Sequence, residues 1–296
     1  MNKAINAKTI NMKTQNFIKA GLITILLGGS LLYSSCGRMR MNDDELEAVS
    51  DNSTAAGASQ EVQNISEQAF TSAGNMSFRG ASNNGSLSAC ATITNDTINN
   101  VLTIDFGTSP CLCKDNRYRQ GQIISSYTGK YRDSGTVIST TFSNYYVGTS
   151  TTAMNQITGT KTVTNNGHNA SGNLNWTIVA ALSVIKANNG GTVTFNENRM
   201  REMIAGATTP FIFSDDKFQV TGSASGTTAK GDNFTAQVLS GHELIRDMSC
   251  PKHFTQGQVD ITVGSKPTMT LDYGSGTCDN TATVTRNGKT KTITLK

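Results

Sequence analysis

The sequence predicts an all-β fold, either an antiparallel β-sandwich or an open barrel-like sheet, preceded by one short N-terminal amphipathic helix. From about residue 88, Thr, Ser, Val and Ile alternate with a period of two and are interrupted by Gly and Asn. That pattern is typical of half-buried antiparallel strands. Asn287-Gly288 between two such runs predicts a type I′ hairpin, whose two central residues both need positive φ. No helical pattern is interleaved with the runs, which argues against a parallel α/β sheet.

The alternation predicts roughly a dozen strands, and about 200 residues are enough to bury the core of one domain. The clearest runs are residues 91–94, 101–106, 136–140, 161–164, 192–195, 281–286 and 290–295.

The chain contains a weak internal repeat. Thr-Ile-Asp-Phe-Gly at 103–107 is followed four residues later by Cys111, and Thr-Leu-Asp-Tyr-Gly at 270–274 is followed four residues later by Cys278. A second echo pairs residues 156–160 with residues 219–223. Two related halves that close around one core would explain the echoes. Independent use of the same strand and turn residues in a Thr-rich chain would explain these sequence echoes equally well.

The N-terminal segment indicates export and lipidation. Residues 1–35 carry four lysines and no acid, and their apolar run at 20–33 suits a signal peptide but is too short to span a bilayer. Leu-Tyr-Ser-Ser-Cys at 32–36 reads as a lipobox, so we expect Cys36 to be diacylated and to become the new N-terminus. The alternative is an uncleaved N-terminal anchor in which Cys36 is an unmodified thiol.

Removal of this segment changes the charge of the protein. The whole chain has 25 basic and 21 acidic residues, and the four lysines of residues 1–35 leave with the signal, so the mature protein has 21 of each. A near-neutral protein lacks the basic face that nucleic-acid binding requires, so no nucleic-acid partner is expected. The predicted location is the outer membrane, where two acyl chains anchor the protein firmly on its periplasmic or cell-surface face.

The mature chain divides into three predicted parts. Residues 36–57 are polar and small and read as the lipidated N-terminus and a flexible tether. Residues 58–87 contain a helix of about three turns, because four apolar residues recur at helical spacing, followed by a linker. Those four residues are Val62, Ile65, Ala69 and Phe70. Residues 88–296 form a single β-rich domain.

Several motifs together resemble a set of uncharacterised Bacteroidota cell-envelope lipoproteins. They lie at residues 103–107, 111–113, 127–135, 140–147, 159–165 and 221–226, and the acidic stretch at 43–45 is similar to the surface-export signals of such lipoproteins. An ordinary solvated charge run would give the same acidic stretch. The resemblance covers about residues 58–296. It implies a shared β-rich extracytoplasmic fold and carries over no activity and no functional residue.

The remaining five cysteines are disulfide candidates, because an extracytoplasmic compartment is oxidising. The internal repeat suggests one link in each half. These are Cys250 with Cys278, and Cys90 with either Cys111 or Cys113.

Metal sites are weaker alternatives, and neither a metal nor a cofactor is predicted. Cys111, Cys113, Cys250 and His253 have the donor types of a tetrahedral zinc site, although oxidation competes for the thiols. The acidic residues at 215–216 and at 232 lie at turns and lack an EF-hand pattern, so they are weak calcium candidates.

Catalytic patterns are scarce. His242 and Glu243, with Asp247 nearby, have the residue types of an acid–base set, yet a surface strand of mixed charge has the same composition. His168 follows Asn166-Gly167 and reads as a loop residue. No G-x-S-x-G, HExxH or phosphate-binding glycine loop is present. We therefore expect that the protein is not an enzyme.

The candidate binding surface is Tyr131, Arg132 and Asp133, where tyrosines cluster in the sequence. A satisfied structural network at a strand turn is the alternative. Trp176 is the only tryptophan, so a platform of several rings for sugar stacking is not evident.

The sequence therefore predicts a lipid-anchored envelope protein that is a non-catalytic binding or structural module. Its expected partners are the membrane, through the anchor, and other envelope proteins or glycans. Two alternatives stay open. One is an envelope hydrolase that uses His242 and Glu243, and the other is a lipid-handling half-barrel protein with an apolar groove.

Overall fold

The computed structural model describes residue 41 and residues 43–73, 91–209, 212–250 and 252–295. Residues 41–296 form one compact unit. The predicted signal peptide at 1–35, Cys36, Cys90 and the linker at 74–87 lie outside the described residues.

The described chain consists of one long helix, one short 3-10 helix at Phe213–Asp215 and a sheet of 15 strands. The helix is α1 (Asp43–Ser72). The strands of the first half are β1 (Thr92–Asp96), β2 (Val101–Asp105), β3 (Cys111–Leu112), β4 (Tyr118–Tyr127), β5 (Val137–Ser150), β6 (Ala153–His168), β7 (Leu174–Ile185) and β8 (Thr192–Ala205). Those of the second half are β9 (Lys217–Thr227), β10 (Asn233–Val238), β11 (Leu244–Asp247), β12 (Gln256–Val263), β13 (Met269–Ser275), β14 (Thr281–Arg286) and β15 (Lys289–Thr294).

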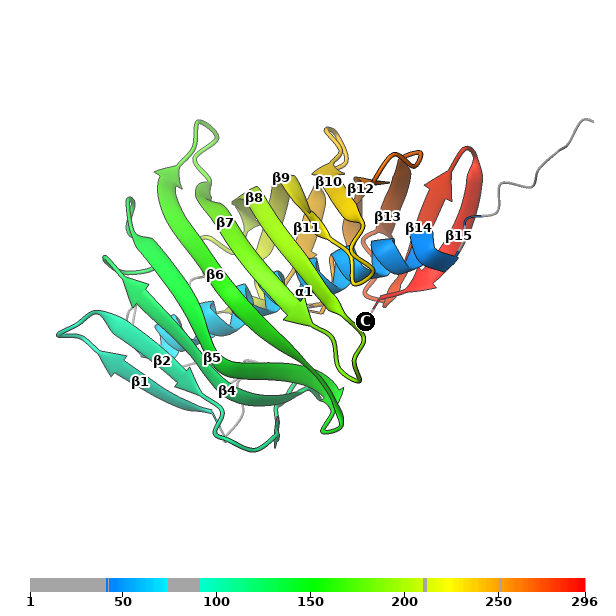
Figure 1. Cartoon of the computed structure of the whole chain (residues 1–296). Helices are drawn as coiled ribbons and strands as arrows, with labels where there is room; N and C mark the ends of the chain where they lie inside the picture. Colours follow the sequence, from blue (N-terminus) through cyan, green and yellow to red (C-terminus); the bar gives the residue numbers. More distant parts are fainter. Residues whose placement is uncertain (1–40, 42, 74–90, 210–211, 251, 296) are drawn as a thin grey trace, which may run out of the picture. The chain divides into compact units, whose positions relative to one another are not determined.

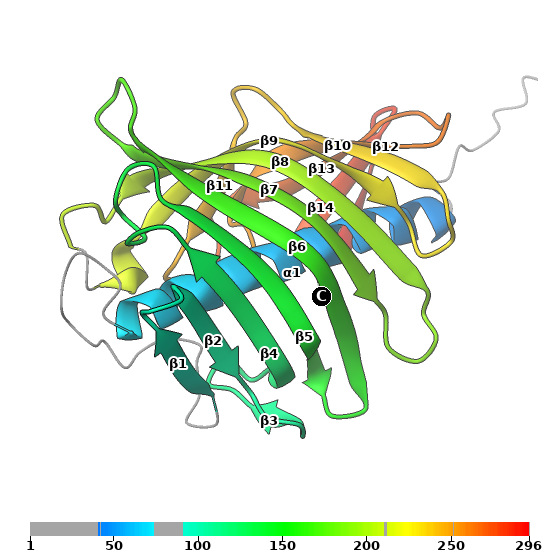
Figure 2. The same ribbon diagram turned by 60° about the vertical axis from the view of Figure 1, so that its left-hand side comes forward.

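The strands follow one another as an antiparallel meander. Their order in the sheet is their order in the chain, except that β3 pairs with β4, and β11 pairs with β9 and β12 beside this path. The sheet curves around α1, which lies along its concave face (Figures 1 and 2). The predicted all-β antiparallel fold with one helix before it is confirmed, in the form of one open, barrel-like sheet.

Most strands bury one face, as their alternating sequence predicts, whereas β1, β3 and β15 have no buried residue. In β7, Trp176, Ile178 and Val184 are fully buried, while Val179 between them is half exposed. Successive side chains of a strand point to opposite faces of the sheet, so the buried set lines the concave side against α1. The predicted Asn287-Gly288 hairpin joins β14 to β15, and both residues have positive φ, 49° and 73°.

The two copies of the sequence repeat have the same local structure. In β2, the Asp105 carboxylate accepts the backbone N–H of Gly107 at 2.7 Å and the side-chain amide of Gln122 at 2.8 Å. In β13, the Asp272 carboxylate accepts the backbone N–H of Gly274 at 2.7 Å and the side-chain amide of Gln258 at 2.8 Å. A β-bulge precedes each glutamine. This arrangement supports two related halves.

The helix differs most from its prediction. It begins at Asp43, so residues 43–57, predicted to be a flexible tether, form its first half, and it packs within the same compact unit as the sheet. The prediction failed because the segment has almost no apolar periodicity. A helix that packs against a sheet over most of its surface needs no strong amphipathic pattern of its own, since tertiary packing supplies most helical stability.

Charge complementarity holds α1 against the sheet. The helix has seven acidic residues and no basic residue, and three of the acids lie in its first turn, where the helix dipole favours negative charge. Six of the seven acids form ion pairs with cations of the β-rich part of the chain. The pairs are Asp44–Lys230, Glu47–Lys230, Glu45–Arg286, Asp51–Lys186, Glu61 with Arg117 and Arg119, and Glu67–Arg201.

Candidate binding cleft between the helix and strands β5 to β7

One face of α1 is left uncovered by the sheet. Its partly or fully exposed positions between 43 and 71 recur every three to four residues, and every position from Val62 to Thr71 is buried. This spacing places them on one face of the helix. They are Asp43, Asp44, Glu47, Ser50, Ser53, Thr54, Gly57 and Glu61.

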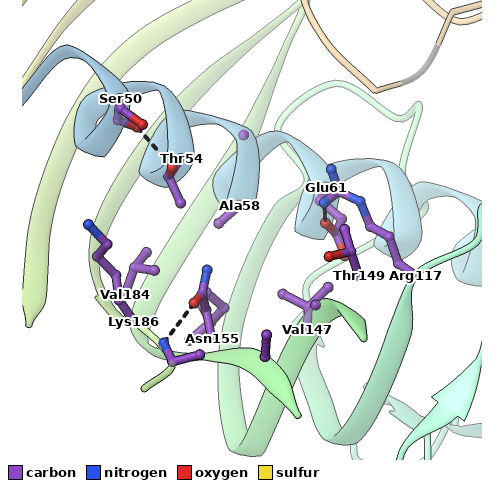
Figure 3. A pocket seen from close by; sticks show the side chains of 15 residues that line it. Ser50, Thr54, Ala58, Glu61, Arg117, Val147, Thr149, Asn155, Val184 and Lys186 are labelled. Carbon is purple, nitrogen blue, oxygen red and sulfur yellow. Dashed lines mark hydrogen bonds and ion pairs between the residues drawn. The ribbon is translucent and has the colours of Figure 1, made fainter. Parts of the chain in front are cut away.

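A cleft of about 350 Å³ lies between this face and the ends of strands β5, β6 and β7 (Figure 3). Its apolar surface comes from Val147 of β5, Ile157 of β6, Val184 of β7 and Ala58 of α1, all of them buried. The volume falls within the range of small-molecule pockets, about 300 to 1,000 Å³.

Small residues of α1 keep the cleft open. A Cβ atom built on Gly57 would have no other heavy atom within 4 Å, because this residue faces the cleft. Beside it, the Thr54 hydroxyl donates to the Ser50 carbonyl at 2.8 Å, within the helix. A bulky side chain at Gly57 would therefore project into the cavity.

One side-chain amide points into the cleft. The oxygen of Asn155 accepts the backbone N–H of Ala187 at 3.0 Å, which fixes the orientation of the amide. Figure 3 shows its nitrogen directed toward α1. The two N–H groups of Asn155 are thus available as donors inside the cleft.

A lysine with two carboxylate neighbours lies at one end of the cleft. Lys186, just after β7, is 2.8 Å from Asp51 and 3.7 Å from Glu47, both of α1. Lys186 therefore already has its counter-charges within the protein.

An arginine network lies at the other end. Glu61 of α1 pairs with Arg117 and, at 2.8 Å, with Arg119, and Arg119 also donates to Asp115 at 2.8 Å. Burial raises the pKa of Glu61, but the two guanidinium groups outweigh it and hold the pKa below its usual value. Glu61 is therefore ionised and locked in place at neutral pH.

A serine and a lysine meet in the interior. The Nζ atom of Lys161 lies 2.6 Å from the Oγ of Ser59, whose hydroxyl donates to Glu197. Burial lowers the pKa of Lys161, and Glu197 offsets only part of that effect. Serine–lysine pairs of this kind act in some hydrolases. Here all three side chains are buried and none lines the cleft, so this cluster joins α1 to β6 and β8.

The predicted binding surface at Tyr131, Arg132 and Asp133 is wrong for Tyr131. Tyr131 is only 4 % exposed, because its ring stacks on Trp176. Its hydroxyl donates to Glu67 and accepts the Gln63 amide at 2.9 Å. This is the satisfied structural network that the sequence left as the alternative. Of its neighbours, Arg132 is half-buried and Asp133 is exposed.

The predicted acid–base residues lie at a strand end. His242 is exposed, and the Glu243 carboxylate accepts the backbone N–H of Gly241 at 2.9 Å, which lowers its pKa. Asp247 lies at the opposite end of β11 and pairs with Lys217 at 2.7 Å. The three groups therefore do not converge on one point. His168 is exposed, as predicted, but it is the last residue of β6 and not a loop residue.

One predicted disulfide is confirmed, and of Cys111 and Cys113 only one is oxidised. Cys250 and Cys278 are bonded, with their Cα atoms 5.6 Å apart. Cys111 is in a disulfide, whereas Cys113 is a free, buried thiol. Oxidation of Cys111 and Cys250 excludes the zinc set with His253. The described residues contain no group of three or more His, Cys, Asp or Glu side chains that could hold a metal ion.

Comparisons with protein-family models, curated proteins and solved structures gave no match. Within the described ranges, no helix has the length and apolar character to cross a membrane.

Sequence reasoning missed the cleft. The spacing of Ser50, Thr54, Gly57 and Glu61 is a helical stripe that is visible in the sequence. Small polar residues are also typical of linkers, so the stripe gave no signal without the sheet that faces it.

Proposed function

We propose that this protein is a lipid-anchored, non-catalytic binding module of the bacterial outer membrane, and that the cleft between α1 and strands β5 to β7 is its binding site. The observation that carries the proposal is the cleft itself, a cavity of about 350 Å³ with an apolar floor and one oriented amide. Pockets with these features are the usual sites for small ligands.

The anchor supports a site close to the membrane. The lipobox ends at Cys36, and α1 begins at Asp43, seven positions later. Seven residues span at most about 25 Å when fully extended. With Cys36 acylated, the start of α1 would therefore be tethered within about that distance of the lipidated residue.

Binding is favoured over catalysis by the arrangement of the reactive groups. His242 and Glu243 do not line the cleft, and Ser59 and Lys161 are enclosed between the helix and the sheet. General acid–base catalysis requires a group within hydrogen-bond reach of the substrate. Alanine substitution of His242 and Glu243 should therefore leave ligand binding unchanged, whereas a hydrolase would lose its activity.

The anchor is tested by mass spectrometry of the mature N-terminal peptide and by cell fractionation. We expect an acyl-modified Cys36 and a membrane-bound protein, and a Cys36→Ala variant that is no longer lipidated. An unmodified Cys36 at the mature N-terminus would overturn this part of the proposal.

The site is tested by native mass spectrometry of the protein isolated from its own membrane. Wild type should retain a small molecule that Gly57→Phe loses, because the phenyl ring fills the cleft. Gly57→Ala is the matched control and should retain the molecule. If all three proteins retain the molecule equally, the binding site lies elsewhere. If none of them retains a molecule, the proposal of a binding site is wrong.

A further inference from the structure

We infer that the cleft binds an uncharged amphiphile, a short acyl or alkyl chain that carries a carbonyl or hydroxyl head group. This inference rests on the proposed function and names the class of ligand. It follows from three properties of the cleft: its apolar floor, its paired charges and its unused hydrogen-bond donors.

The floor suits a hydrocarbon chain. Val147, Ile157 and Val184 come from three adjacent strands, and Ala58 of the helix lines the same cleft. Burial of a chain against these side chains contributes about 0.8 kcal/mol for each methylene removed from water. None of the described residues that line the cleft is aromatic, so they offer no ring stacking to a sugar or a base.

The charges around the cleft are already paired. Lys186 has Asp51 at 2.8 Å, and Arg117 has Glu61. A ligand carboxylate would lie beside Asp51 and Glu61, and a ligand ammonium would lie beside Lys186 and Arg117, so either charge would meet a like charge as well as an opposite one. Taking an ion out of water is costly unless a partner repays it, and the partners here are already engaged with each other. The cleft therefore disfavours both anionic and cationic ligands.

The polar capacity that remains suits neutral oxygen atoms. The Asn155 amide offers two N–H donors, and its oxygen is already occupied by the Ala187 N–H. Ser50 and Thr149 also line the cleft, and each carries a hydroxyl group. An ester or amide carbonyl accepts from Asn155, and head-group hydroxyls pair with Ser50 and Thr149.

The volume limits the length of the chain. A cavity of 150 Å³ holds a benzene molecule, so a cleft of about 350 Å³ holds roughly 14 non-hydrogen atoms. Monooctanoylglycerol is close to this size, and octanoate and octyltrimethylammonium have the same chain with a negative or a positive head.

The test is calorimetric titration of the full chain carrying Cys36→Ala, so that its own acyl chains do not compete, with these three probes below their micelle concentrations. We expect monooctanoylglycerol to bind at least tenfold more tightly than either charged probe. Gly57→Phe should abolish binding, and Gly57→Ala should keep it. Asn155→Asp keeps the oxygen that accepts from Ala187 but removes both donors, and should weaken binding of the glycerol ester about tenfold.

The outcomes separate this inference from the proposed function. If octanoate or octyltrimethylammonium binds as well as the glycerol ester, and Gly57→Phe abolishes that binding, the cleft is the site but the ligand class is wrong. If none of the three probes binds wild type, the inference is wrong, and native mass spectrometry decides the proposed function independently. If Gly57→Phe binds the ester as wild type does, the cleft is not the site and both are overturned.

Discussion

Glu67 in the last part of α1 and Arg201 in β8 form a buried ion pair, although 134 residues separate them in the sequence. The Tyr131 hydroxyl donates to the same carboxylate, and the Arg201 guanidinium lies over the Phe218 ring, 3.3 Å from its centroid. Burial raises the pKa of Glu67, but Arg201 and the hydrogen bonds outweigh it and hold the pKa below its ordinary value. This cluster fixes the C-terminal part of α1 against the middle of the sheet.

Breaking this pair should destabilise the protein strongly. Glu67→Gln leaves Arg201 buried without a counter-charge, which costs about 3 to 5 kcal/mol of unfolding free energy. Glu67→Gln combined with Arg201→Met removes both charges, so its cost should fall well below the sum of the two single changes. Urea unfolding of wild type, Glu67→Gln, Arg201→Met and the double variant completes a double-mutant cycle. Additive costs would show that the two residues do not depend on each other.

Gly57→Ala should stabilise the protein. Gly57 lies in the middle of α1, and a Cβ atom there meets no other atom within 4 Å. Alanine restricts the unfolded chain and favours the helix, so the free energy of unfolding should rise by about 0.5 to 1 kcal/mol. A loss of stability would mean that the cleft is closed in solution.

Asp216 should make stability depend on pH between pH 5 and pH 8. Burial, reinforced by Glu67, raises its pKa from 3.8 to about 7, and its Oδ1 has no hydrogen-bond partner among the described residues. A carboxyl whose pKa is higher in the folded protein binds its proton more tightly when folded. Its contribution to stability is therefore present at low pH and is lost as the pH rises through about 7.

The measurement compares wild type with Asp216→Asn by urea unfolding at pH 5 and at pH 8. The comparison is needed because the pKa of His253 falls to about 4 through burial, which gives a slope of opposite sign at the acid end of this range. From pH 5 to pH 8, the free energy of unfolding of Asp216→Asn should rise by roughly 1 to 3 kcal/mol relative to that of wild type. Asp215→Asn, at the exposed neighbour, should show little change, and a gain as large as that of Asp216→Asn would refute the assignment.

Loss of the Cys250–Cys278 link should destabilise the second half of the sheet. The two residues are 28 positions apart, and closing a loop of this length restricts the unfolded chain by about 3.5 kcal/mol. Replacing both cysteines by alanine avoids new free thiols. Thermal unfolding should then shift to lower temperature, and an unchanged midpoint would show that the link adds no constraint.

The sequence was informative wherever structure depends on neighbours along the chain. Alternation of β-branched residues predicted the strands, Asn287-Gly288 predicted its hairpin, and the repeat around Cys278 predicted the disulfide with Cys250. Residues 43–57 and the cleft were missed for a different reason. Both depend on contacts between α1 and strands more than 70 residues away, such as Lys186 with Asp51. Tyr131 was misplaced for the same reason, because its partner Glu67 lies on the helix.

Methyl-resolved NMR of the labelled protein during titration with monooctanoylglycerol tests most directly whether the cleft is the binding site. The account predicts that the methyl signals of Val147, Ile157 and Val184, which line the cleft, shift in a saturable way. Those of Ile104 and Val284, which are buried in β2 and β14 away from it, should stay unchanged. Saturable binding without any shift at the three cleft residues would contradict the account.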